Sequence, residues 1–287
     1  MISRSAVRRL SALGRTMQQA KSPQRTFATG ACLIIGDEIL NGKIHDTNSH
    51  YFARFCFRLG IDVRQIAVVS DQEEDIVEAV QRLSAKYDFI VTSGGIGPTH
   101  DDITYEAIGK VFGLPVKLHE ETAERMTRLS KYTPPSDEAK RAQLRMATLP
   151  TGDNVENIYI ADDLWVPVVC INGQVHILPG VPQIFERMLE GLKGHVQSHL
   201  AAGGKQARRF VSTKKKESDI ATYLTKLQNE VGKSIKIGSY PHMKIGTVTV
   251  SIIGPSEQEE KLKEIVKDVE KNLDGQEISA EQEEGRI

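Results

Sequence analysis

A glycine-rich segment at residues 93–104 carries the strongest chemical signal in this sequence. It reads Ser-Gly-Gly-Ile-Gly-Pro-Thr-His-Asp-Asp-Ile-Thr and follows the short apolar run 89–91. Because glycine has no Cβ, backbone N–H groups can converge there on an anion, and a following helix adds its positive end. The segment is not a Walker loop, since no Gly-Lys-Ser/Thr follows, and it lacks the third glycine of a dinucleotide fingerprint. It predicts a site for the phosphates of a nucleotide-like ligand.

Two carboxylates in the same segment conflict with a bare phosphate site. Asp101 and Asp102 stand at the end of the loop that should receive the anion. A divalent cation that bridges carboxylate and phosphate removes this conflict, so we expect a metal such as Mg²⁺, Co²⁺ or Mn²⁺ as cofactor. The alternative is that one or both carboxylates cap the following helix.

A second acidic segment follows the first apolar run, 31–35. Its candidate metal and ligand residues are Asp37, Glu38, Asn41, Asp46 and Asn48. In a doubly wound sheet the segment would face the same rim as the glycine loop, because both follow strands of that sheet. Two acidic segments at one phosphate site fit attack by a metal-bound water. Taken alone, Asp37 and Glu38 also fit loop charge, and Asp46 fits a helix cap.

Strands and helices alternate through the first part of the chain. Apolar runs at 31–35, 63–69 and 89–91 predict buried strands, with helices from about 46 to 60 and after a Ser70–Glu73 capping box. This alternation predicts a three-layer, doubly wound, mostly parallel α/β sheet.

The middle of the chain has a different pattern. It is helical over 114–145 with an interruption at Pro134-Pro135. Apolar runs at 166–171 and 175–178 predict a hairpin across Asn172 and Gly173. A further helix follows Pro182 and extends to about residue 200.

A linker at 201–205 predicts a second, smaller unit. Strands at 208–212, 235–240 and 247–253 and helices at 218–231 and 258–273 form a small α+β subdomain over residues 206–275. The acidic tail, 276–287, is expected to fray.

The N-terminal segment, residues 1–27, is basic and contains no acidic residue. Such a segment is typical of a mitochondrial presequence, and we expect import into the matrix with cleavage near Phe27. One alternative is a basic tail with no targeting function. Another is initiation of translation at Met17, which would give a cytosolic form. Without the six basic residues the net charge falls from −1 to about −7, which gives no reason to bind nucleic acid. No apolar run reaches the ~18–20 residues of a membrane span.

Cysteines and histidines give weaker signals. Cys32, Cys56 and Cys170 have no CxxC spacing and are predicted to be buried, reduced thiols. His195 and His199 are four residues apart on a predicted helix with no glutamate between them. We therefore expect solvated helix histidines and not a zinc pair.

Together these segments resemble the molybdopterin-binding domain of the MoaB/CinA superfamily. The resemblance rests on Gly-Asp-Glu-Ile-Leu at 36–40 with Asp-Thr-Asn at 46–48, on residues 93–102, and on Leu-Pro-Gly-Val-Pro at 178–182. It covers residues 28–200. Gly-Ser-Tyr-Pro at 238–241 is similar to the C-terminal subdomain of CinA-like proteins and eukaryotic FAD synthases. Within the superfamily, the chain most resembles the N-terminal domain of eukaryotic FAD synthase and stand-alone FAD pyrophosphatases.

This resemblance implies a MoaB/Mog-like fold, metal-dependent hydrolysis of FAD to FMN and AMP, and a homo-oligomer. The alternatives are molybdopterin binding or adenylylation, and a catalytically idle flavin-binding module. The Gly-x-Ala-Pro-Gly segment of CinA proteins is replaced at 157–165, which argues against a CinA-type substrate. We expect neither deamidation nor FAD synthesis. The predicted catalytic and metal-binding residues are Asp37, Asp101 and Asp102. The predicted ligand contacts are Asn41, Asp46, Asn48, Ser93, Gly94, Gly95, Gly97, Thr99, Pro179 and Gly180.

Overall fold

The computed structural model describes residues 26–200 and 206–285. The predicted presequence, except for its last two residues, and the predicted linker at 201–205 lie outside the described residues. No helix in the described ranges is both long and apolar enough to cross a membrane.

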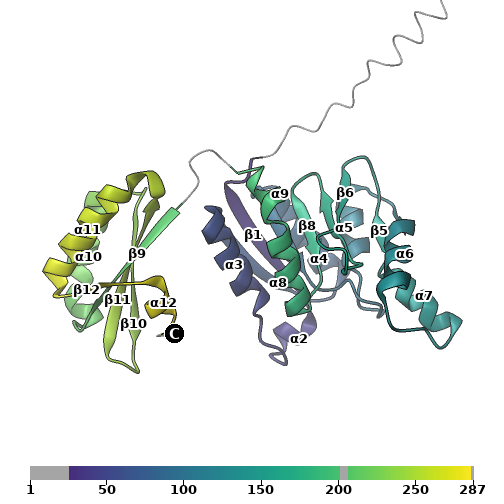
Figure 1. Ribbon diagram of the computed structural model, residues 1–287, viewed down its shortest axis with the longest axis horizontal. Helices are drawn as coiled ribbons and strands as arrows, with labels where there is room; N and C mark the ends of the chain where they lie inside the picture. Colours follow the sequence, from purple (N-terminus) through teal and green to yellow (C-terminus); the bar gives the residue numbers. More distant parts are fainter. Residues whose placement is uncertain (1–25, 201–205, 286–287) are drawn as a thin grey trace, which may run out of the picture. The chain divides into compact units, whose positions relative to one another are not determined.

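Six strands form the central sheet of the N-terminal domain, in the order β2-β1-β3-β8-β7-β6 (Figure 1). They are β1 (Thr29–Ile35), β2 (Asp62–Val69), β3 (Phe89–Ser93), β6 (Val155–Ile158), β7 (Val168–Ile171) and β8 (Val175–Leu178). Strand β8 pairs with β3 in parallel, whereas β7 runs antiparallel to both β6 and β8. The sheet is mixed and mostly parallel, as the sequence predicts.

Helices cover both faces of this sheet (Figure 1). They are α2 (Asp37–Leu40), α3 (Asn48–Leu59), α4 (Glu73–Ser84), α5 (Thr104–Phe112), α8 (Pro182–Gly191) and α9 (Lys193–Gln197). Helices α4 and α5 lie side by side on one face, and α8 and α9 cover the other. Every residue of β3, β7 and β8 is buried, which explains their continuous apolar sequences.

The predicted hairpin between β7 and β8 is confirmed. Ile171 pairs with Val175, and Asn172 and Gly173 have φ of 56° and 60°. Two successive positive φ values match the right-handed twist of the flanking strands, and Asn-Gly tolerates them best.

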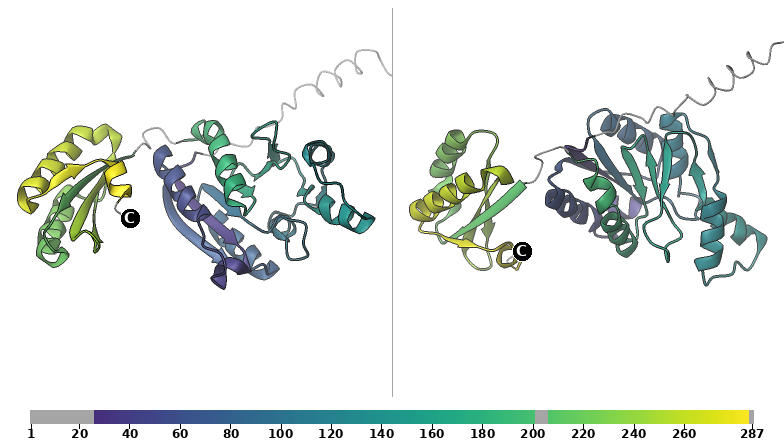
Figure 2. Two further views of the ribbon diagram at one scale, coloured as in Figure 1. Left: turned by 60° about the horizontal axis from the view of Figure 1, so that its bottom comes forward. Right: turned by 45° about the horizontal axis from the view of Figure 1, so that its top comes forward.

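The helical pattern predicted over 114–145 is confirmed with its interruption at Pro134-Pro135, because one helix ends before the two prolines and another begins after them, but its first residues form a strand. Strands β4 (Val116–Leu118) and β5 (Thr148–Pro150) form a separate two-stranded sheet. Helices α6 (Glu120–Leu129) and α7 (Asp137–Arg145) lie between these two strands in the sequence. Figure 2 shows α6 and α7 together at one end of the domain. Three-residue strands are too short to give a period-2 pattern, so the sequence predicts neither.

The predicted capping box of α4 is also wrong. The N-cap is Gln72, whose side chain makes no capping hydrogen bond, and the hydroxyl of Ser70 donates to the carboxylate of Asp75 instead. Three acidic residues in the first turn complement the positive end of the helix without that cap.

The C-terminal subdomain has a four-stranded antiparallel sheet in the order β10-β11-β9-β12. Its elements are β9 (Gln206–Thr213), α10 (Glu217–Val231), β10 (Lys236–His242), β11 (Thr247–Pro255), a 3-10 turn (Ser256–Gln258), α11 (Glu259–Leu273), β12 (Gln276–Ile278) and α12 (Ala280–Glu284). Alternate residues of β11, including Val250 and Ile252, pack against Leu262 and Val269 of α11. The residues between them, Thr249 and Ser251, are buried on the opposite face, so both faces of β11 are covered and one of them is apolar.

The expectation of a frayed end after Gly275 is wrong for the residues described. Strand β12 pairs with β9, and Ser279 and Gln282 form a capping box at the start of α12. Glu283 is buried, and its carboxylate accepts hydrogen bonds from His242 Nε2 at 3.1 Å and Thr249 Oγ1 at 2.7 Å. A buried carboxylate with two partners fixes the acidic segment to the sheet.

We expect Glu283→Ala to lower the free energy of local opening of β12 and α12 by about 1–3 kcal/mol, the cost of leaving buried polar partners unsatisfied. Glu281→Ala, on the exposed side of the same helix, is the matched control and should change it little. Hydrogen exchange of the amides of β9 and β12 measures both. Equal exchange in the two variants would show that the buried contacts contribute nothing.

Candidate functional site

The glycine loop leaves β3 in a conformation that only glycine permits. Gly94 and Gly95 have φ of 110° and 65°. A Cβ on Gly94 would lie 2.1 Å from the carbonyl oxygen of Ile35, and one on Gly95 would lie 2.3 Å from Thr104 Oγ1. The loop is therefore pressed against the end of β1 and the start of α5. Within the described part of the chain, the N–H groups of Gly95 and Ile96 donate to no other group, so both remain available to an anion.

The loop is tied to the first turn of α5. The backbone N–H of Thr104 donates to Gly95 O at 2.9 Å, and its hydroxyl donates to Gly94 O at 3.0 Å. The N-cap of α5 is Ile103 and has no side-chain cap. The alternative that Asp101 or Asp102 caps this helix is therefore wrong. The positive end of α5 points at the loop with no capping carboxylate.

Asp102 closes the loop on itself. Its Oδ1 accepts the N–H of Gly97 at 2.6 Å, and its Oδ2 accepts the N–H and hydroxyl of Thr99 at 2.8 and 2.5 Å. The N–H groups of Gly97 and Thr99, which the sequence predicts to face a ligand, are used within the loop. Arg145 donates to the carbonyl oxygen of Asp102 at 3.1 Å. Asp102 thus shapes the loop, and Arg145 places a positive charge beside it.

Carboxylates from three successive loops gather at this rim. The backbone N–H of Asp37, after β1, donates to Asp71 Oδ2 at 2.8 Å, after β2. Burial raises the pKa of Asp71, the hydrogen bond from Asp37 opposes that shift, and the charges of Asp37, Glu38 and Asp101 add to it. Asp101 follows β3, so the two acidic segments of the sequence meet here. The sequence analysis does not identify Asp71, although its place two residues after the predicted strand 63–69 is an available signal.

This acidic cluster (Asp37, Glu38, Asp71 and Asp101) offers only oxygen donors, which suit hard cations such as Mg²⁺. Among the described residues, no three of its carboxylates have ligand atoms within 4.8 Å of one another. Such spacing fits an ion that takes one or two carboxylates and completes its shell with water and ligand phosphate.

The raised pKa of Asp71 predicts a pH dependence of stability. Its folded pKa lies above its unfolded value of about 3.9, so its stabilising contribution is complete below that value and is lost as pH rises through the folded pKa. In Asp71→Asn, the decrease in stability with rising pH should be absent. A divalent cation should lower the pKa of the Asp71 carboxyl in the wild type. Unfolding experiments between about pH 3 and pH 7 and carboxyl NMR shifts measure the two effects. An unchanged pH profile in Asp71→Asn, with exposed Asp153→Asn as control, would contradict the assignment.

Three predicted ligand residues come together beside the loop. Asn48 Nδ2 donates to Ser93 Oγ at 2.9 Å and to Gly180 O at 2.8 Å, which joins the start of α3 to the segments after β3 and β8. A Cβ on Gly180 would lie 3.2 Å from the Cα of Gly94. The Oδ1 atom of Asn48 is buried and accepts no hydrogen bond within the described residues.

The remaining predicted ligand residues have structural contacts. Asp46 Oδ1 accepts the N–H of Ser49 at 3.0 Å, so Asp46 caps the start of α3, which is the second of the two roles predicted for it. Asn41 Oδ1 accepts the N–H of Lys43 at 3.0 Å within an exposed turn. Pro179 is buried directly before Gly180. These three residues shape the loops around the site, and their contact with a ligand stays a prediction.

A largely apolar cavity of about 400 Å³ adjoins the loop at Pro98. Six of its lining residues are Pro98, Met126, Tyr132, Gln143, Met146 and Trp165. Its volume lies in the range of small-molecule sites, and aromatic walls suit a planar ring system. No local sequence pattern predicts it, because its walls come from α6, α7 and distant loops.

Comparisons with known proteins agree with this architecture. Residues 31–197 match a family described as a probable molybdopterin binding domain, and residues 205–282 match one described as the FAD synthase middle domain. A probable FAD synthase from Caenorhabditis elegans is 31% identical over 280 residues, which cover 89% of this chain and 51% of that protein. The chain thus spans about half the length of that relative.

Two further relatives are similar over most of their own length. A protein from Archaeoglobus fulgidus is 30% identical over 241 residues, covering 84% of this chain and 96% of that protein. The crystal structure of the protein CinA, of unknown function, from Thermoplasma acidophilum superposes with a TM-score of 0.52 at 27% identity. It covers 59% of this chain and 98% of that chain, which confirms the expected fold.

Proposed function

This chain belongs to the family of probable molybdopterin binding domains, and from that premise we propose that it hydrolyses FAD, or a related ADP-containing dinucleotide, in a metal-dependent reaction. The reaction adds water across the phosphoric anhydride and converts FAD to FMN and AMP. The observation that carries the proposal is the acidic cluster on the same rim as the open glycine loop. Similarity to a probable FAD synthase supports a flavin nucleotide as the substrate class.

The loop supplies the anion site in this mechanism. The free N–H groups of Gly95 and Ile96 and the positive end of α5 hold phosphate oxygens, and Arg145 adds a positive charge nearby. Asp102 keeps the loop in shape by accepting three hydrogen bonds. These groups orient the anhydride before the reaction, so little reorganisation is needed when charge develops on its oxygens.

The acidic cluster would hold the cation through one or two of its carboxylates, and Asp101 is the candidate that lies nearest the glycine loop in sequence. A divalent cation bound there supplies positive charge to the phosphates and lowers the pKa of water. Without that charge, the carboxylates would repel the dianionic ligand, so they oppose binding of substrate alone. The cavity beside Pro98, with Tyr132 and Trp165 in its wall, would accept a ring of the nucleotide.

A second candidate function is the binding or adenylylation of molybdopterin, which the description of the matched family favours. Both candidates need a phosphate loop beside a cavity for a ring, and the fold alone does not choose between them. They differ in their products, because adenylylation consumes ATP and releases pyrophosphate whereas hydrolysis of FAD yields FMN and AMP.

The deciding experiment incubates the full chain with FAD, with ADP-ribose, and with molybdopterin plus ATP, each with and without Mg²⁺, Co²⁺ or Mn²⁺. We expect FMN and AMP from FAD only when a divalent metal is present, as measured by chromatography. Asp101→Asn serves as the variant with a weakened cation site. Turnover of molybdopterin with ATP in place of FAD would favour the second candidate. If the chain binds FAD but does not hydrolyse it with any of the metals, its function is flavin binding without catalysis.

We also propose that residues 1–27 direct the protein to the mitochondrial matrix, because the segment is rich in arginine and free of acids. Fusion of residues 1–35 to a fluorescent reporter tests this. A purely cytosolic reporter would refute it, and a mixed distribution would support an additional start at Met17.

A further inference from the structure

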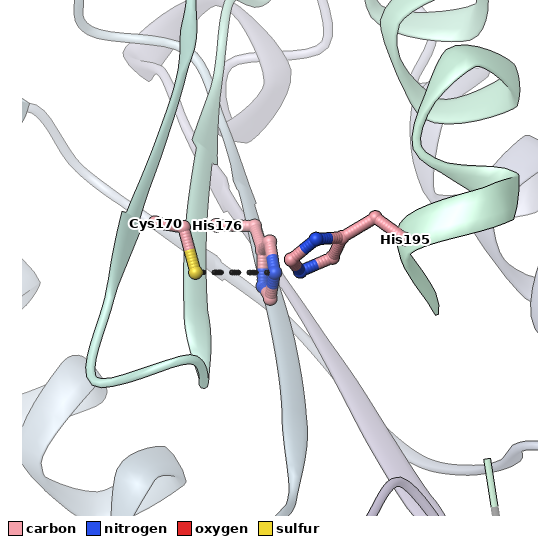
Figure 3. Close-up of side chains that lie close together, drawn as sticks. All are labelled: Cys170, His176 and His195. Carbon is pink, nitrogen blue, oxygen red and sulfur yellow. Dashed lines mark hydrogen bonds between the residues drawn. The ribbon is translucent and has the colours of Figure 1, made fainter. Parts of the chain in front are cut away.

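A second cluster of possible metal ligands lies in the N-terminal domain, outside the phosphate site. Cys170 on β7 and His176 on β8 are partners in the antiparallel register, so their side chains share one face of the sheet. His195, on α9, points toward them from above that face (Figure 3). Each residue offers one ligand atom, and these atoms lie within 4.8 Å of one another. It is the one group of three such residues among those the structure describes.

Hydrogen bonds define the protonation of this cluster. His176 Nδ1 lies 3.1 Å from the carbonyl oxygen of Gln174, so it carries the proton and donates it. The lone pair on Nε2 then faces Cys170 Sγ at 3.4 Å, where the thiol donates to it (Figure 3). A ring N–H held by a backbone carbonyl is the arrangement that orients metal-binding histidines.

The third residue has an unsatisfied polar atom. His195 Nε2 is buried and has no hydrogen-bond partner within the described residues. The ring packs among others, with centroid distances of 5.8 Å to His176 and 4.8 Å to His199. His195 is therefore half-buried, with its Nε2 atom shielded from solvent, whereas a fully solvated helix histidine was expected. An unpartnered nitrogen in such surroundings is destabilising unless a ligand takes its lone pair.

We propose that Cys170, His176 and His195 bind one Zn²⁺ ion. Zinc bonds of about 2.3 Å to sulfur and 2.0–2.1 Å to nitrogen in a tetrahedron place S and N about 3.6 Å apart, close to the 3.4 Å between Cys170 Sγ and His176 Nε2. On binding, the thiol of Cys170 releases its proton to solvent and the thiolate takes the ion. Both histidines bind as neutral rings.

Glu156 completes the charge balance. It lies opposite Cys170 in the register of β6 and β7, so the row Glu156, Cys170 and His176 crosses three adjacent strands on one face. One thiolate leaves a zinc site with one net positive charge, which this carboxylate offsets. The ion would fasten the last helix of the domain, α9, to the sheet.

The test uses the full chain, stripped of metal by a chelator and titrated with Zn²⁺ and with Co²⁺. We expect about one tightly bound ion per chain with a thiolate-to-cobalt charge-transfer absorption, and a rise in melting temperature. Cys170→Ala and His195→Gln should each weaken binding by at least about tenfold, and the first should also abolish the absorption. Cys32→Ala removes a buried free thiol from β1 and should change neither.

Equal binding by Cys170→Ala and the wild type would overturn the proposal. If that variant does not fold, the wild-type spectrum still decides, because a cobalt complex without the thiolate absorption also overturns it. The acidic cluster contains no sulfur, so cobalt bound there gives no such absorption. The zinc site and the proposed hydrolysis therefore succeed or fail independently.

Discussion

Gly94→Ala should abolish ligand binding at the phosphate loop and destabilise the domain by roughly 3–5 kcal/mol. The backbone of Gly94 has φ of 110°, which a residue with a Cβ rarely adopts. The new Cβ would also lie 2.1 Å from the carbonyl oxygen of Ile35. That neighbour is backbone inside a buried strand, so it cannot rotate away as a flexible side chain would. Either the loop or the end of β1 must move.

Gly113→Ala is the matched control. Gly113 ends α5 with φ of 64°, and a Cβ there would meet nothing within 4 Å. It therefore reports backbone strain alone, about 1–2 kcal/mol. Urea unfolding measures stability, and quenching of flavin fluorescence measures binding of FAD. Equal effects of the two substitutions on both quantities would show that the close approach of loop and β1 is unimportant.

The sequence predicts the parts of the fold that have long or continuous signals. Strand β3 is an apolar run, α3 is bounded by Asp46 and Gly60, and the Asn172-Gly173 turn has a specific conformational reason. Strands β4, β5 and β6 have three or four residues each and give no periodicity. Their pairing depends on contacts between distant segments.

The candidate site divides in the same way. The glycines and the adjacent carboxylates predict the phosphate loop, because the residues that form it are close together in the sequence. Asp71 and Arg145 are single charged residues in ordinary surroundings, and only the meeting of loops at the rim of the sheet gives them a role. His195 was misjudged for a related reason, since helical spacing does not reveal that Cys170 and His176 lie below it.

Asp101→Asn and Asp102→Asn should have different kinetic effects under the proposed hydrolysis. Asp102 accepts three hydrogen bonds from Gly97 and Thr99, and an asparagine at its position would turn an N–H group toward those donors. We expect the loop to deform and kcat/KM to fall by at least ~10²-fold at every metal concentration, the scale for losing an oriented anion site. Asp101 is exposed and belongs to the acidic cluster, so its replacement should instead lower the affinity of the site for the cation. The metal concentration for half-maximal activity should rise by about tenfold, and saturating metal should restore turnover.

Steady-state rates of FMN release at several concentrations of Mg²⁺, Co²⁺ and FAD separate the two effects, with Asp153→Asn as the surface control. Circular dichroism and thermal unfolding show whether Asp102→Asn keeps the fold. They distinguish a local change in the loop from unfolding of the whole domain. If Asp102→Asn hydrolyses FAD at the wild-type rate with unchanged metal dependence, its three hydrogen bonds do not set the loop. The proposed role of Asp102 in shaping the loop would then be wrong, and the hydrolysis would depend on the acidic cluster without it.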